Sequence, residues 1–178
     1  MFQPGTHVQS KSWTPELDAG RHHRAKLGFI LMSTDPAAEA DFADMAPEGV
    51  AVHVTRLKTE DYTTNETLAR HIDYMADCAS RLQPDVHPDV VSYHCTSGSI
   101  VIGEERVFAE IRQGAPWAQP MCIFTGVVDA LRTLKAKKIV VGTPYLDEIN
   151  TVEAEALVAK GFEVLDIQGL NLANGIDM

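Results

Sequence analysis

Short apolar runs that favour β-strands alternate with helix-compatible stretches along most of this chain. Strands are expected near residues 26–32, 50–57, 90–93, 121–124, 139–141 and 162–167. Helices are expected between them, near residues 36–45, 65–82, 100–113, 126–135 and 146–160. The continuous apolar run at 26–32 is typical of a parallel strand that is buried on both faces, whereas residues 50–57 alternate and are rich in valine. The alternation of strands and helices therefore predicts an α/β fold with a mostly parallel sheet, Rossmann-like or flavodoxin-like.

A weak internal repeat suggests two similar halves. Residues 27–35, which follow Lys26, share their apolar run and hydroxyl-bearing turn with residues 138–146, which begin at Lys138. Residues 48–52 match residues 160–164 at nearly the same offset, which is about 110 residues. We therefore expect two pseudo-symmetric α/β domains. Their expected bounds are a flexible tail at 1–25, a first half at 26–135 and the start of a second half at 136–178.

The repeat also predicts that the second half is incomplete in this sequence. A second-half counterpart of the strand at 90–93 and its following turn would fall near position ~205. That position lies beyond Met178. An unpartnered final strand would leave an open edge and apolar faces. We therefore expect a truncated sequence or a chain that a partner completes.

Charge and cysteine content restrict the classes of function. The formal net charge of −10 argues against a general nucleic-acid binder, which needs clustered lysine and arginine. No window approaches the ~18 apolar residues of a membrane span, and the amino terminus lacks the apolar core of a secretory signal. The three cysteines show no paired spacing, which indicates reduced thiols and a cytoplasmic protein. The sequence leaves open whether identical copies form a homo-oligomer.

The strand at 90–93 leads into a turn rich in nucleophilic and hydroxyl-bearing side chains. Cys95, Thr96 and Ser97 follow the strand directly and precede a helix-compatible stretch. In α/β proteins, the carboxyl end of a strand and the amino terminus of the next helix form the usual ligand site. Unpaired N–H groups there favour a carboxylate or a thiolate. Cys95 is therefore the candidate reactive residue, whereas strand alternation predicts that the side chain of His94 points away from it.

The other cysteines and the histidines of the tail have simpler interpretations. Cys78 lies beside the apolar stripe of the helix expected at 65–82, and Cys122 lies inside an apolar run. Both are expected to be buried hydrophobic residues without chemistry. His7, His22 and His23 could in principle bind a metal. A flexible solvated tail is the favoured interpretation, because nothing fixes their spacing.

Two segments resemble the aspartate/glutamate racemase superfamily, and in particular the branch with maleate cis–trans isomerase, arylmalonate decarboxylase and the ectoine-utilisation protein A group. One is His-Cys-Thr-Ser-Gly-Ser at 94–99 with Val-Ile-Gly-Glu at 101–104. The other is Gly-Thr-Pro-Tyr-Leu-Asp-Glu-Ile-Asn at 142–150. The resemblance extends from about residue 25 to residue 170. It covers nearly the whole chain but only some two-thirds of a family member.

The resemblance implies two facing α/β halves, an active site in the cleft between them and no metal or organic cofactor. It implies that Cys95 is the first-half catalytic cysteine. Asp35 stands where the family often has asparagine, which would put a negative charge near the substrate. The resemblance also implies that Thr96, Ser97 and Tyr145 hold the substrate carboxylate, and that Ser33 and Thr34 lie in the family's first loop, which touches the substrate.

The implied function is an isomerase, racemase or decarboxylase acting at the carbon next to a carboxylate of a small acid. Fixed N–H and O–H donors stabilise the enolate-like charge, by about 3 kcal/mol per donor. Two opposed thiols give racemisation, whereas one thiol suffices for protonation after decarboxylation or for addition to a double bond. The alternatives are a non-catalytic protein that binds small carboxylates and an inactive fragment that lacks the second cysteine.

Overall fold

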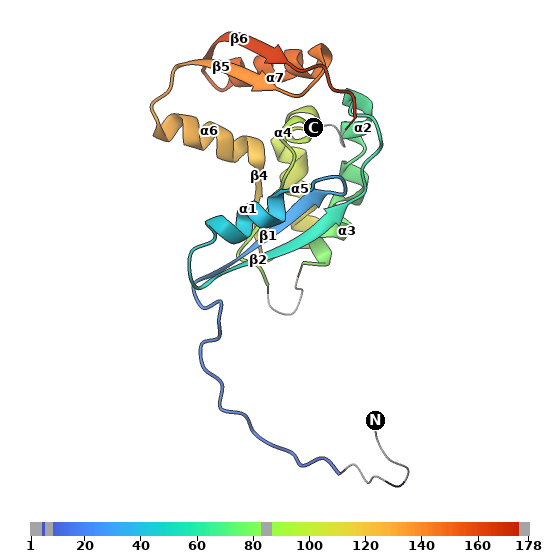
Figure 1. Ribbon diagram of the computed structural model, residues 1–178, viewed down its shortest axis with the longest axis vertical. Helices are drawn as coiled ribbons and strands as arrows, with labels where there is room; N and C mark the ends of the chain where they lie inside the picture. The colour runs from blue at the N-terminus through green and yellow to red at the C-terminus, as the bar shows by residue number, and fades with distance from the viewer. Residues whose placement is uncertain (1–4, 6–8, 83–86, 175–178) are drawn as a thin grey trace.

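The computed structural model describes residues 5, 9–82 and 87–174, which form two parallel sheets with helices packed around them (Figure 1). The first sheet has the strand order β2-β1-β3-β4, and the second pairs β5 with β6. This arrangement confirms the expected α/β class with parallel sheet. The strands are β1 (Ala25–Met32), β2 (Val50–Leu57), β3 (Val90–Tyr93), β4 (Gln119–Cys122), β5 (Lys138–Thr143) and β6 (Glu163–Gly169).

Helices cover both faces of the first sheet, and α4 and α6 lie between the two sheets (Figure 1). Alternate residues of β1 point to opposite faces. Leu31 packs against Phe42 of α1, whereas Ile30 faces a larger cluster that includes residues of α3 and α5. The helices are α1 (Ala38–Met45), α2 (Asn65–Ala69), α3 (Ile72–Ser80), α4 (Thr96–Ile102), α5 (Glu104–Gly114), α6 (Ile123–Thr133) and α7 (Asp147–Ala159).

Two predicted helices are each broken into two. The helix expected at 65–82 divides at Arg70 and His71, and α2 begins with a capping box between Thr64 and Thr67. The helix expected at 100–113 begins earlier, at Thr96, and is interrupted at Gly103. Gly103 has a φ of 90°, a conformation that glycine adopts without strain. The break at Arg70 and His71 occurs beside the cavity described below, which His71 lines.

Two element starts also differ from the prediction. The strand expected at 121–124 lies at 119–122, because Gln119 pairs with Val90 at the start of β3. Phe124 is consequently a buried residue of α6. Helix α1 begins at Ala38 and not at Pro36, where the prediction placed its first residue. The Asp35 carboxylate accepts hydrogen bonds from the N–H groups of residues 37 and 38. Cys78 and Cys122 are both buried, as expected.

The second sheet belongs to a β5–α7–β6 unit with the same order as β1–α1–β2. The proposed division near residue 135 falls in the turn between α6 and β5 and stays a prediction. Residues 9–24 are exposed and lie outside helices and strands. The rest of the expected tail, including His7, lies outside the described residues apart from Gly5. None of the helices in the described part of the chain is long and apolar enough to cross a membrane.

The order of the first sheet determines where a ligand site is expected. Strands β1 and β3 are neighbours, but the chain leaves them toward opposite faces of the sheet. At such a switch point the loops after the two strands diverge and leave a crevice at their carboxyl ends. The loop after β1 contains Thr34, and the turn after β3 contains Cys95. The two segments singled out from the sequence therefore meet at one edge.

Candidate active site

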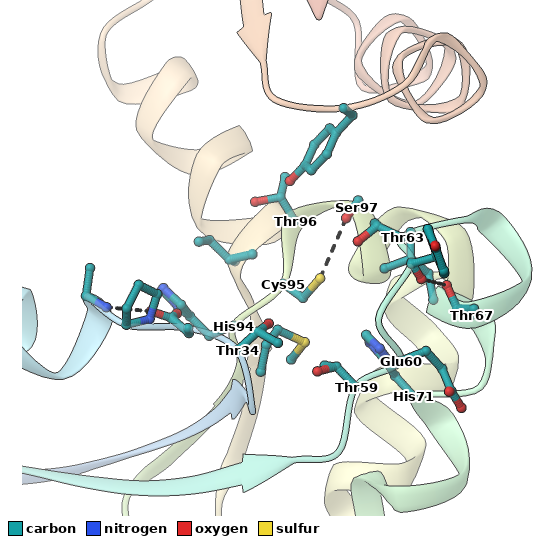
Figure 2. A pocket seen from close by; sticks show the side chains of 18 residues that line it. Thr34, Thr59, Glu60, Thr63, Thr67, His71, His94, Cys95, Thr96 and Ser97 are labelled. Atoms are coloured by element: carbon teal, nitrogen blue, oxygen red, sulfur yellow. Dashed lines mark hydrogen bonds between the residues drawn. The ribbon is translucent and has the colours of Figure 1, made fainter. Parts of the chain in front are cut away.

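A cavity of about 370 Å³ lies at this edge of the first sheet (Figure 2). The loop after β1, the segment between β2 and α3, the turn after β3 and the loop after β5 contribute to it. Four of the residues predicted from the sequence line the cavity with Cys95: Thr34, Thr96, Ser97 and Tyr145. The cavity therefore brings together side chains from both sheets.

Cys95 is held at the start of α4 with its side chain facing polar donors. Its extended backbone makes it the N-cap of the helix, and the Gly98 N–H donates to Cys95 Sγ at 3.3 Å. The Ser97 hydroxyl lies 3.6 Å from the sulfur (Figure 2). Burial raises the pKa of the Cys95 thiol, and hydrogen bonds from Gly98, Ser97 and Tyr93 act in the opposite direction. The site thus stabilises a thiolate locally while the surrounding low dielectric favours the thiol.

Tyr145 faces this turn from the loop between β5 and α7. Burial, followed by the charge of a Cys95 thiolate, raises the pKa of Tyr145 to about 12, whereas hydrogen bonds to Ser97 lower it. The tyrosine is therefore a neutral O–H donor at physiological pH. Asn150 fixes the loop, because its side-chain N–H donates to the Tyr145 carbonyl and its oxygen accepts from the Thr143 hydroxyl.

The polar residues of the loop after β1 make different contacts. Thr34 and Asp35 line the cavity. Ser33 is not among the described residues that line it, because its hydroxyl is paired with the Thr59 hydroxyl at 2.6 Å and accepts the Thr59 N–H. Ser33 thus joins the end of β1 to the segment after β2. Its expected contact with substrate stays a prediction that this geometry does not favour.

His94 packs away from the thiol although it borders the cavity. Its ring meets Phe42 edge to face, with ring centroids 5.0 Å apart. Burial lowers the pKa of His94, and the Asp35 carboxylate partly offsets this. A neutral, aromatic-packed imidazole does not supply a positive charge to the sulfur. This agrees with the side-chain direction expected from strand alternation.

The segment between β2 and α3 was not predicted to be part of the site. It lines the far wall of the cavity with several hydroxyls, a carboxylate and an imidazole (Figure 2). The Thr63 N–H donates to the carbonyl of Ala173, so the chain after β6 holds the segment in place. A dense run of threonines after a strand was the available signal. The labelled residues of this wall are Thr59, Glu60, Thr63, Thr67 and His71.

No group of three or more histidine, cysteine or acidic side chains that could bind a metal occurs within residues 9–82 and 87–174. His22 and His53 approach each other with ring centroids 6.4 Å apart. Two imidazoles alone are fewer ligands than structural metal sites use.

Comparison with known proteins places the chain in a family. The profile described as arylmalonate decarboxylase matches residues 27–178. The chain belongs to this family, within the branch of the aspartate/glutamate racemase superfamily that its motifs indicated. It is 24% identical to a maleate isomerase of Geobacillus stearothermophilus over 168 residues, which are 86% of this chain and 66% of that protein. It is also 24% identical to a maleate isomerase of Pseudomonas putida over 85% of this chain and 65% of that protein.

Solved structures show the same fold. A maleate isomerase from Pseudomonas putida with bound maleate superposes with a TM-score of 0.75 at 23% identity, over 86% of this chain and 66% of that chain. A liganded arylmalonate decarboxylase variant superposes with a TM-score of 0.73 at 24% identity, over 84% of this chain and 63% of that chain. The sequence thus spans about two thirds of the length of the relatives that it matches.

Proposed function

We propose that the chain acts at the carbon next to a carboxylate of a small acid, without a cofactor, and that Cys95 is the nucleophile or proton donor. One observation carries the proposal: the Cys95 thiol lies in a cavity in which the Gly98 N–H donates to it, the Ser97 hydroxyl is its hydrogen-bond partner and Tyr145 is a neutral hydroxyl nearby. Donors aimed at the sulfur stabilise its thiolate form, which is the form in which cysteine reacts. The family assignment supports the same class of chemistry.

Cis–trans isomerisation of an unsaturated diacid is the reaction that a single thiol supports best. The Cys95 thiolate adds to one alkene carbon and forms a C–S bond, while the π electron pair moves to the neighbouring carbon and its carboxylate. The central bond is then single and rotates. The electron pair returns, the C–S bond breaks and the thiolate leaves. A Nocardia farcinica maleate cis–trans isomerase variant with a covalently bound succinylcysteine intermediate supports this route by analogy.

Decarboxylation of an arylmalonate is the second reaction open to one thiol. Loss of carbon dioxide leaves an enediolate that the Thr96 and Tyr145 hydroxyls of the cavity lining would stabilise, and the thiol then transfers its proton to the carbon. Burial raises the pKa of Cys95, which keeps the thiol protonated and suits this step. Racemisation by two thiols finds less support, because Cys95 is the one cysteine among the described residues that line the cavity.

The test is turnover in deuterated water. The purified chain is incubated with maleate, an arylmalonate, aspartate and glutamate, and NMR follows the trans alkene, carbon dioxide loss and deuterium exchange. We expect one of these reactions, reduced about a hundredfold or more in Cys95→Ala because the thiol is the reacting group. Cys78→Ala removes a thiol that lies outside the cavity lining and serves as the matched control. Absence of all three reactions would overturn the enzymatic proposal.

Carboxylate binding without turnover is the second candidate. The hydroxyls of Thr96, Ser97 and Tyr145 that line the cavity favour it, since they can hold a carboxylate whether or not Cys95 reacts. Calorimetric titration with maleate and succinate distinguishes the two candidates. Binding that survives in Cys95→Ala, together with no turnover by the unmodified chain, supports a binding protein.

A further inference from the structure

A buried histidine and tyrosine lie directly behind the reactive thiol. His71 Nδ1 is 2.6 Å from the Tyr93 hydroxyl, and the two side chains are 5% and 0% exposed. The Tyr93 hydroxyl lies beneath the first turn of α4. A Cβ at Gly98 would approach it to 2.1 Å and would lie 3.1 Å from Cys95 Sγ. The absence of a side chain at Gly98 therefore lets the hydroxyl reach the region of the sulfur.

We propose that His71 is a positioning residue for Cys95: its Nδ1–H donates to the Tyr93 oxygen, so that the Tyr93 hydroxyl donates its own proton to the Cys95 sulfur. The sulfur then receives donors from Gly98, Ser97 and Tyr93. Hydrogen bonds to a charged group are stronger than those to a neutral one, so this arrangement stabilises the thiolate. The inference deepens the proposed function and rests on it, but it concerns the ionisation of the thiol alone.

The direction of the His71–Tyr93 hydrogen bond decides the effect on the sulfur. A hydroxyl has one proton, which goes either to the imidazole or to the sulfur. If Nδ1 accepted this proton, the Tyr93 oxygen could only accept from the thiol and would stabilise its protonated form. Burial lowers the pKa of His71 to about 4, so the ring is neutral and has a single N–H at physiological pH. The ring also lines the cavity, where water or substrate can pair with its second nitrogen.

Other ionisable groups face the same region and remain in every variant used below. Asp35 and Glu60 line the cavity from the segments after β1 and β2. Tyr145 approaches from the loop after β5, and Cys122 of β4 lies close enough to Tyr93 to affect its pKa. His94 packs on Phe42 beside the turn. Differences between variants therefore report on the His71–Tyr93 pair against a constant background.

The experiment measures the rate at which iodoacetamide alkylates Cys95 as a function of pH, with peptide mass spectrometry to separate the three cysteines. Tyr93→Phe should slow alkylation about tenfold below the wild-type midpoint, which corresponds to a rise of about one unit in the thiol pKa. His71→Ala should shift the midpoint in the same direction. Tyr74→Phe changes an exposed tyrosine on α3 and should leave the profile unchanged.

Two further variants separate positioning from general damage to the fold. Because His71 acts only through Tyr93, the double variant Tyr93→Phe/His71→Ala should match Tyr93→Phe alone. His71→Asn places an amide N–H near the Nδ1 position and should restore most of the wild-type profile. A lowered or unchanged midpoint in His71→Ala, or additive shifts in the double variant, would overturn the proposal.

The position of the proton on the His71 ring can be measured on the unmodified protein. Nitrogen-15 chemical shifts of the histidine rings identify which ring nitrogen holds the proton. We expect protonated Nδ1 in His71, and protonation at Nε2 alone would contradict the proposal. If the alkylation profiles shift as expected and no carboxylate is turned over, the proposed function fails while this inference stands. Turnover with unshifted profiles would overturn this inference and leave the proposed function intact.

Discussion

The two sheets differ in how completely their strands are covered. In the first sheet, Ile30 and Leu31 of β1 are fully buried on opposite faces by separate apolar clusters. In the second, Val140 of β5 is 68% exposed and Leu165 of β6 is 57% exposed. The first sheet is therefore covered on both faces, whereas the second packs Ile139, Val141 and Val164 against the larger cluster and leaves its other face exposed. We expect the two sheets to differ accordingly in how much their side chains contribute to stability.

The largest expected effect tests this difference between the two sheets directly. Ile30→Ala empties a fully buried position and should lower the free energy of unfolding by about 2–5 kcal/mol. Val140→Ala, the matched truncation of an exposed β-branched residue in β5, should change it by less than about 0.5 kcal/mol. Urea unfolding followed by circular dichroism measures both. Equal losses in the two variants would show that the second sheet contributes as much core as the first.

The second-largest expected effect is the loss of stability in acid, which we attribute to the buried His71 beside the first sheet. His71 has a folded pKa of about 4, lowered by burial from its usual 6.5. Between these values the unfolded chain binds a proton that the folded chain does not. The stability is therefore fully present above pH 6.5 and declines as the pH falls toward 4, by about 3 kcal/mol in total.

His71→Asn removes the titrating ring and should flatten the decline of the unfolding free energy between pH 6.5 and 4. Tyr74→Phe, on the same side of the sheet but exposed, should retain the wild-type slope. The measurement is urea unfolding at closely spaced pH values. An unchanged slope in His71→Asn would place the acid sensitivity in another part of the molecule.

The parts of the fold that local patterns determine were predictable from the sequence. The strands at 50–57 and 90–93 have their predicted bounds, because valine-rich stretches of this length favour the extended backbone of a strand. The helix break at Arg70 and His71 was not predictable. Arg70 and His71 interrupt a stretch with a continuous helical stripe, and the break lets His71 meet Tyr93, a partner 22 residues away in the sequence. A long-range contact of this kind overrides local helical preference.

The candidate site was likewise only partly predictable from the sequence. The turn at Cys95 could be found because strand, nucleophile and helix start are adjacent in the sequence. Ser33 and Thr34 are adjacent and both polar, yet only Thr34 lines the cavity, since Ser33 pairs with Thr59 from the neighbouring strand's loop. The hydroxyl-rich wall before α3 was missed for the same reason. Which hydroxyl faces the ligand depends on pairing between segments that are distant in the sequence.

The smallest expected effect concerns the ion pair between the end of α7, beside the second sheet, and α5, beside the first. Lys160, just after α7, pairs with Glu104 of α5 and lies 5.7 Å from the centre of the Phe124 ring in α6. Thr125 also donates to Glu104. The Lys160 and Glu104 side chains are only 32% and 20% exposed, so solvent screens the pair incompletely. Lys160→Met should lower the free energy of unfolding by about 1 kcal/mol at neutral pH.

The pH dependence of this loss identifies its origin. Burial alone would raise the pKa of Glu104, but Lys160 and Thr125 outweigh it and the net pKa is lowered. The contribution of the pair is therefore present above the ordinary glutamate pKa of 4.5 and disappears as the pH falls through the lower folded value. Wild type and Lys160→Met should converge there, whereas Lys138→Met, which breaks an exposed pair with Glu163, should cost less than about 0.5 kcal/mol throughout. A loss in Lys160→Met that persists in acid would assign the coupling of the two regions to its packing on Phe124 instead of its charge.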